Sequence, residues 1–172
     1  MGKKALLFFV SLFLVSVGPF AARATAQSVK TVRLKHQLKD GQVVRASFAL
    51  PDGWRLSSRE TGSVSLKRDG SAAVALVAIT QEKSVIASAL DAGRSFSEMG
   101  CQVKVNVDEA VAGQGITKVT VEAKCDNRVH GLAIFRAFPG RKTVMLVGLI
   151  AIPGPMSQGN TLMRAWEKAR LR

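Results

Sequence analysis

Two cysteines, Cys101 and Cys125, have the spacing in this chain that most clearly predicts chemistry. Each lies at the end of a stretch in which apolar and polar residues alternate, as in half-buried strands. A hairpin centred on Gly113 pairs the two cysteines and sets Lys104 opposite Glu122. The same register pairs Val103 with Ala123, Val105 with Val121, and Val107 with Val119. We therefore predict a cross-strand disulfide closing a loop of about 25 residues, worth roughly 3–4 kcal/mol. The alternative is a pair of free buried thiols; the spacing is not the Cys-x-x-Cys of redox-active pairs.

The sequence contains few residues whose types and spacing suggest catalysis. His36 and His130 are the only histidines, and no matching cluster of Cys or Asp accompanies them, so we predict no metal site. The adjacent acids Asp108 and Glu109 point to opposite faces of a strand and therefore do not form a carboxylate dyad. The sequence has no nucleophile elbow, phosphate loop or dinucleotide fingerprint. We expect a non-enzymatic protein without catalytic residues or cofactors, although a hydrolase site assembled from distant residues stays open.

Basic residues form the candidate contact surface. Charged and apolar positions alternate over residues 30–50, so the cations are expected on one exposed face of a hairpin. They are Arg33, Lys35, Lys39 and Arg45, with Lys30 nearby. A register centred on Gly41 pairs the apolar face as Leu38 with Val44, His36 with Ala46, Leu34 with Phe48, and Val32 with Leu50. A second, weaker candidate consists of Arg164, Lys168, Arg170 and Arg172. The alternative to both is a solvated face without a partner.

The first 26 residues have the layout of a secretory signal. Lys3 and Lys4 precede an apolar stretch at 5–20, and the Ala-Thr-Ala at 24–26 is a small-x-small cleavage site. The stretch is shorter than the roughly 20 residues of a spanning helix, which disfavours an uncleaved anchor. We predict a cleaved signal peptide at 1–26, a single mature domain at 27–172, and a periplasmic or secreted location after cleavage near Ala26.

The charge balance favours anionic partners. Cleavage removes Lys3, Lys4 and Arg23 and takes the formal net charge from +13 to +10. This charge suits a protein with an acidic face or an anionic component of the envelope, including peripheral contact with a membrane surface. Nucleic acid is not an expected partner, because the basic residues are spread along the chain and aromatic residues for base stacking are few.

The remaining pattern predicts an α+β fold, an antiparallel β-sheet with helices packed on it. Pro51-Asp52-Gly53 is a turn, after which Trp54 is expected to be a structural anchor in the core. Helical periodicity covers 85–99, with an N-cap at Ser84, and a last helix is expected from Asn160 with Trp166 facing inward. Strands are expected at 64–66, 72–80, 129–138 and 143–152, and those at 72–80 and 143–152 are apolar enough to be covered on both faces. In the first helix the inward stripe is expected to be Ile86, Ala89, Leu90, Gly93, Phe96 and Met99.

The stretch Phe48-Ala-Leu-Pro-Asp-Gly-Trp54 resembles the strand-Pro-x-Gly-Trp entry of Mog1/PsbP-like domains. The order of strands and helices over 30–172 is similar to that group as well. The resemblance implies an α/β/α sandwich and a non-catalytic binding or accessory role, and it supplies no catalytic residue. We therefore expect an exported binding or accessory protein of a bacterial envelope that recognises an anionic or acidic-faced partner. An inhibitor or immunity protein against a secreted hydrolase is a second hypothesis, and a hydrolase a third.

Overall fold

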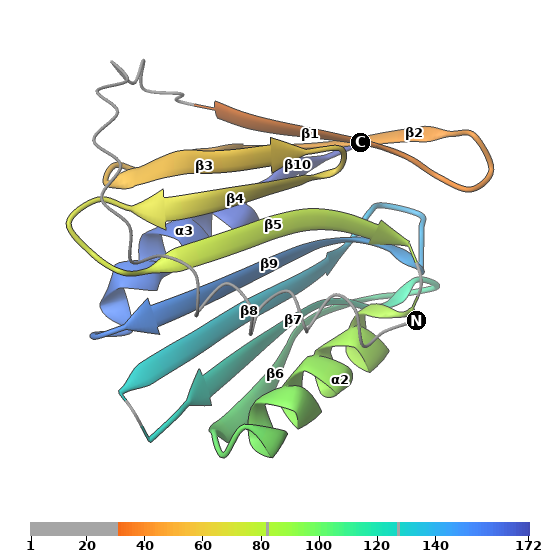
Figure 1. Ribbon diagram of the computed structural model, residues 1–172. Coiled ribbons are helices and arrows are strands. Elements are labelled where there is room, and N and C mark those ends of the chain that lie inside the picture. The colour runs from red at the N-terminus through yellow and green to blue at the C-terminus, as the bar shows by residue number, and fades with distance from the viewer. Residues whose placement is uncertain (1–30, 82, 127) are drawn as a thin grey trace.

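The computed structural model describes residues 31–81, 83–126 and 128–172. The predicted signal peptide and Lys30 lie outside these ranges. The described chain has the expected α+β architecture, in which antiparallel strands form two sheets and helices pack on both sides of the larger one (Figure 1). Neither helix of this part of the chain is long and apolar enough to cross a membrane.

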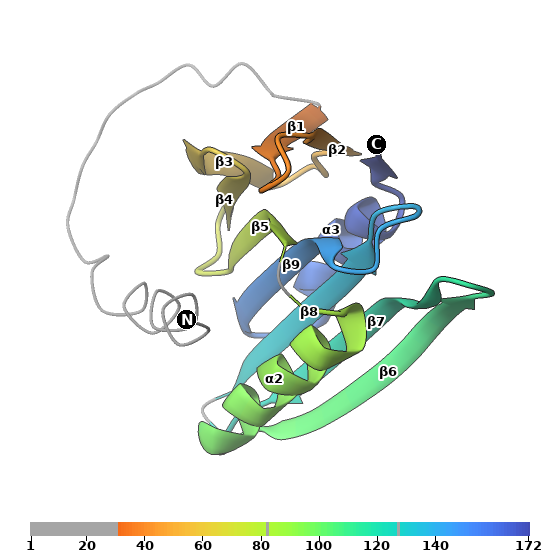
Figure 2. The ribbon, with the colours of Figure 1, turned by 90° about the vertical axis from the view of Figure 1, so that its right-hand side faces the viewer.

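The large sheet has seven strands in the order β3-β4-β5-β9-β8-β7-β6. Their bounds are β3 Trp54–Glu60, β4 Ser63–Arg68, β5 Val74–Gln81, β6 Gln102–Val111, β7 Gly115–Lys124, β8 Val129–Ala137 and β9 Val144–Pro153. Every neighbouring pair is antiparallel. The sheet is curved, and α2 (Val85–Glu98) lies against its β6 to β8 end (Figure 2).

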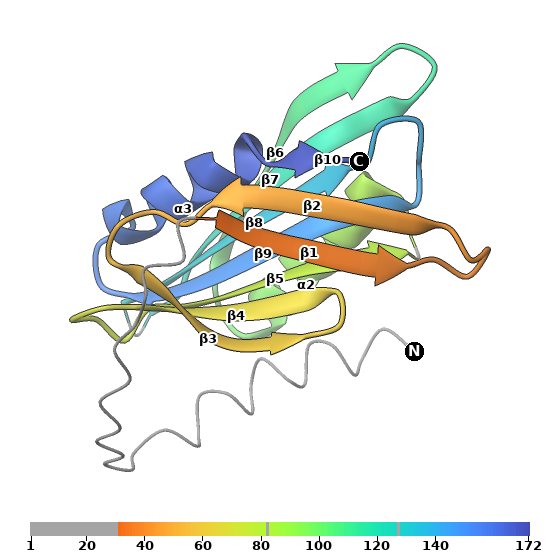
Figure 3. The ribbon, with the colours of Figure 1, turned by 90° about the horizontal axis from the view of Figure 1, so that it is seen from above.

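The small sheet has three strands in the order β1-β2-β10, with bounds Thr31–Gln37, Val43–Ala49 and Arg170–Leu171. It lies over the large sheet together with α3 (Ser157–Glu167), as Figure 3 shows from above. Strand alternation directs Val32, Leu34 and the other apolar residues of β1 and β2 into the main core between the two sheets. Phe48 of β2 meets the fully buried Trp166 of α3 edge to face, with ring centroids 6.4 Å apart.

Both tryptophans have the expected burial. The amide of Trp54 donates to the carbonyl of Pro51 across the turn, and the ring is only 4% exposed. Trp166 packs directly on Gly148 of β9, where a Cβ atom would come within 2.3 Å of the indole. This glycine is therefore required by close approach, because any side chain would occupy the space of the ring.

The helix α2 begins and ends where the sequence predicts. The Ser84 side chain accepts a hydrogen bond from the amide of Ala87, and Gly100, at a φ of +79°, follows the last turn. The predicted inward stripe is wrong at two positions, because Leu90 and Met99 are 52% and 51% exposed. The physical reason is that α2 covers only β6, β7 and β8, so the two residues lie beyond the contact with the sheet.

The strand predicted at 72–80 was expected to be covered on both faces of the large sheet, and it is covered on one. On β5, Ala75, Val77 and Ile79 face the main core, but the alternate residues are only half-buried because α2 does not extend over this strand. Two strands were missed, β3 and β10. α3 begins at Ser157 rather than at Asn160, and it has no side-chain cap.

The register predicted for the first hairpin is wrong by two residues. Val32 pairs with Phe48, Leu34 with Ala46, and His36 with Val44. The side chain of Asp40 accepts from the amide of Gln42, and Gly41 takes a φ of +82°, which centres the turn one residue earlier. A two-residue shift leaves every apolar residue on the same face, so alternation alone does not distinguish the two registers.

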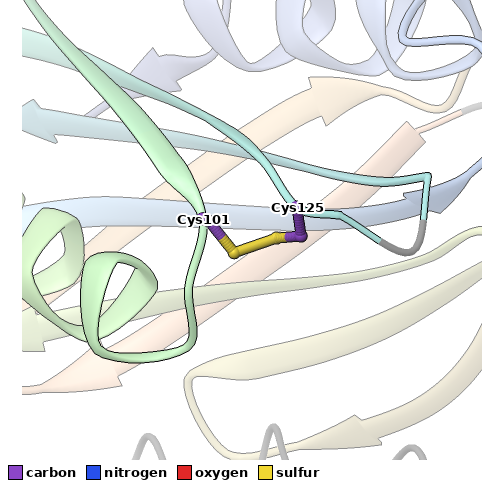
Figure 4. The surroundings of a disulfide bond; sticks show 2 residues. All are labelled: Cys101 and Cys125. Carbon is purple, nitrogen blue, oxygen red and sulfur yellow. A yellow bond between two sulfur atoms is a disulfide. The ribbon is translucent and has the colours of Figure 1, made fainter.

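The register of the second hairpin, β6 with β7, is the predicted one. Val103 pairs with Ala123 and Lys104 with Glu122 before a bulge displaces the strands beyond Val107. Cys101 and Cys125 form the expected disulfide at the base of this hairpin (Figure 4). The bond joins the end of α2 to the start of the turn after β7, at the edge of the large sheet.

Candidate anion-binding surface

The strand β10 brings the two predicted basic regions together. The backbone amides of Arg45 and Arg172 each donate to the other's carbonyl, at 2.8 and 2.9 Å, and Arg170 pairs with Ser47. The end of the chain therefore extends the β1–β2 hairpin by one strand (Figure 3). Residues more than 120 positions apart in sequence, such as Ser47 and Arg170, thus lie side by side in one small sheet.

Five cations share the outer face of this sheet, which we call the basic face: Arg33, Lys35, Arg45, Arg170 and Arg172. They lie in two rows across the strands. One row is Arg33, Ser47 and Arg170, and the other is Lys35, Arg45 and Arg172. With strands about 4.8 Å apart and alternate residues about 7 Å apart along a strand, the five Cα atoms fit within roughly 10 by 7 Å.

The charges of the basic face are exposed and have no partner of opposite sign within the described chain. All five residues are exposed, whereas their neighbours in sequence, such as Val32 and Leu34, are buried. The ion pairs of the described residues lie elsewhere, at Arg55–Asp69, Lys83–Asp91 and Lys118–Glu167. The outer positions of β1 and β2 that are not basic carry uncharged residues: Thr31, Gln37, Val43, Ser47 and Ala49.

The other predicted cations that the structure describes lie off this face. Lys39 is in the turn of the first hairpin, where its amide donates to the side chain of Gln81. Arg164 and Lys168 belong to α3 and its C-cap, and Arg164 lines a groove between α3 and the β6–β7 hairpin. The basic residues of the C-terminal region are thus divided, because only the segment after α3 continues as a strand.

Two shallow hollows lie away from the basic face. The groove beside α3 has a volume of about 310 Å³ and is lined by acids at Asp108, Glu122 and Glu167 besides Arg164. The second, of about 290 Å³, lies beside the disulfide and is lined by residues that include Lys124, Arg128 and His130. Within the described ranges, no group of three or more His, Cys, Asp or Glu residues is arranged to hold a metal ion.

The two histidines belong to strands of the two sheets. His36 faces inward from β1, half-buried, with its Nδ1 atom lacking a hydrogen-bond partner and close to Gly62. His130 pairs with Lys124 on β7 and with Ile152 on β9. Both are parts of sheets, and Asp108 and Glu109 flank the bulge of β6.

Comparison with known proteins gives one kind of match. No family model matches the chain, and neither does any curated protein. Solved structures similar to it include the Ran-binding protein Mog1p of Saccharomyces cerevisiae and a point mutant of protein Mog1. They are 11% and 12% identical, with 78% of this chain and 84% of theirs covered, at a TM-score of 0.42 in each case. At this identity and TM-score the matches are a distant likeness, and they carry no argument about the fold family or about what this chain binds.

Proposed function

We propose that the protein is an exported, non-catalytic binding or accessory protein of a bacterial periplasm or envelope. Its basic face binds a partner that is anionic or presents an acidic surface. The observation that carries the proposal is the row Lys35, Arg45 and Arg172, in which three cations lie directly opposite one another on neighbouring strands.

This row is unfavourable for the fold itself. Like charges directly opposite each other destabilise an antiparallel pair. Two unit charges about 7 Å apart repel by roughly 0.6 kcal/mol in water, and several such pairs occur on this face. No acid of the described chain offsets the repulsion by an ion pair. An anionic partner would offset it, so the arrangement suits binding better than it suits stability.

The test is capture of partners from an envelope extract by the oxidised domain, residues 27–172. The face variant R33Q/K35Q/R45Q removes three charges from the basic face. The control variant R94Q/K104Q/K124Q removes three exposed charges from α2, β6 and β7, at the other end of the molecule (Figure 1). The two variants have the same net charge as each other, so a difference in what they capture reports the position of the charges rather than the overall charge.

The wild type and the control variant are expected to retain the same anionic or acidic material at low salt, and the face variant is expected to lose it. At about 0.5 M salt, exposed charge–charge attraction is strongly screened, so retention by the wild type and by the control variant should fall as well. Equal retention by the face and control variants at low salt would refute the assignment of the surface. A partner retained equally by all three at both salts would be bound elsewhere on the molecule.

A further inference from the structure

We infer that the partner of the basic face is the headgroup surface of a bilayer containing anionic phospholipid. This inference rests on the proposed function and narrows it to one class of partner. Three features of the face carry it: its place on the outer side of a sheet, its lack of aromatic side chains, and the extension of its charge around the tip of the first hairpin.

The basic face lies outside both described hollows. It is the outer side of a three-stranded sheet, and neither described hollow is lined by any of its five cations. Its uncharged residues are small or aliphatic, and it carries no aromatic residue. Protein interfaces draw most of their energy from a few buried anchors, commonly Trp, Tyr or Arg in a pocket. Of these anchors the basic face carries only arginines, and all of them are exposed. A protein partner would meet charge on this face, but no aromatic residue and neither of the described hollows.

A bilayer does not need such pockets. Anionic lipids diffuse in the plane of the membrane and gather beneath whatever pattern of cations is presented, so fixed complementary positions are unnecessary. Each Lys or Arg near an anionic membrane surface strengthens binding by a factor of about five, and the effect declines within a Debye length. Five cations on one flat face can approach such a plane together, whereas five cations spread over a sphere cannot.

The charge continues around the tip of the β1–β2 hairpin, which projects beyond the large sheet (Figure 3). Lys39 is exposed in the turn beside one acid, Asp40, and the Arg141 guanidinium donates to the side chain of Gln42, which ties the loop after β8 to this turn. Lys142 in that loop is also exposed. Val43, 38% exposed, lies on the outer face at the same end and is its one large exposed apolar residue among those described. The tip is therefore suited to enter the headgroup layer.

The experiment is cosedimentation of the oxidised domain 27–172 with vesicles of phosphatidylcholine alone or with 30% phosphatidylglycerol. The wild type and the control variant R94Q/K104Q/K124Q are expected to bind the mixed vesicles and not the neutral ones. The face variant R33Q/K35Q/R45Q should bind the mixed vesicles about 100-fold more weakly, a factor of about five for each charge. Binding should be lost at about 0.5 M salt.

Two results would overturn the inference: wild-type binding that does not depend on phosphatidylglycerol, or an equal loss in the control and face variants. These results are distinguishable from failure of the proposed function. If vesicle binding is absent but the basic face still captures material from the envelope extract, the partner is an acidic protein or polysaccharide and the proposed function stands. If the face variant captures as much as the wild type in both assays, both conclusions fail. Circular dichroism of each variant establishes that it is folded.

Discussion

Removing the Cys101–Cys125 disulfide should destabilise the domain by an amount that follows from its position in the chain. The two cysteines are 24 residues apart, so the bond closes a loop of about 25 residues. In the chain-entropy treatment, such a loop loses about 12 cal/mol/K of unfolded-state entropy, or about 3.5 kcal/mol at 25 °C. For a domain of this size, 1 kcal/mol corresponds to about 3 °C in Tm. The double variant C101S/C125S should therefore unfold about 10 °C lower.

The assay is chemical and thermal unfolding of the wild type with and without reductant, beside the double variant. Reduced wild type and the variant should coincide, and the variant should not respond to reductant. The loss should appear in all amides that exchange through global unfolding, in both sheets, because the loop-closure entropy belongs to the unfolded chain. A loss below about 1 kcal/mol, or a loss confined to β6 and β7, would refute the loop-closure reasoning.

Two further predictions concern packing and charge. In urea unfolding, G148A should destabilise the domain by about 2–3 kcal/mol, because the added Cβ would lie 2.3 Å from the Trp166 ring. G93A is the control: its Cβ would meet only methyl groups at 3.4 Å, so it should be neutral or stabilising by up to about 1 kcal/mol. The hydrogen bond from Lys83 lowers the pKa of the Asp91 carboxyl below its ordinary 3.8. The small stability that this exposed pair supplies is therefore present above pH 3.8 and is lost as the pH falls through the lowered pKa. K83A should raise the pKa of Asp91 in an NMR titration, and an unchanged pKa would contradict the pairing.

The two hairpins show how much of the fold alternation predicts. Alternation fixes the face of each side chain in both, but a shift of two residues preserves it. In β6–β7 the cysteine pair and the pairing of Lys104 with Glu122 excluded other registers. In β1–β2 all candidate registers were apolar against apolar, and the turn geometry at Asp40 decided between them. The register of a hairpin is thus predictable where its cross-strand pairs include distinctive ones, such as two cysteines or a Lys opposite a Glu.

The two missed strands lacked a local signal. β3, with the sequence WRLSSRE, is mostly polar and has a shift of register between Leu56 and Ser58, so no alternation identifies it. β10 has two residues, too few for any periodicity, and it exists because Ser47 and Ala46 of β2 offer an unpaired edge. Arg170, Leu171 and Arg172 do alternate in the sense of a strand, but a three-residue pattern is too short to identify one. The charges of β10 were therefore missed as part of the first basic surface.

The basic face is separable from the core, and this separation leads to one more expected outcome. Its side chains point away from the core, which Val32, Leu34 and Phe48 fill from the opposite side of the same strands. Replacing its cations thus changes no core contact and removes the repulsion within the row that contains Lys35 and Arg45. The face variant should consequently unfold at the same temperature as the wild type or slightly higher, while it loses its partner. A row of opposed like charges that costs stability is better explained by the proposed binding role than by a contribution to the fold. A Tm several degrees below that of the wild type would contradict this reasoning, because the cations would then be stabilising the sheet and the main argument for a binding role would fail.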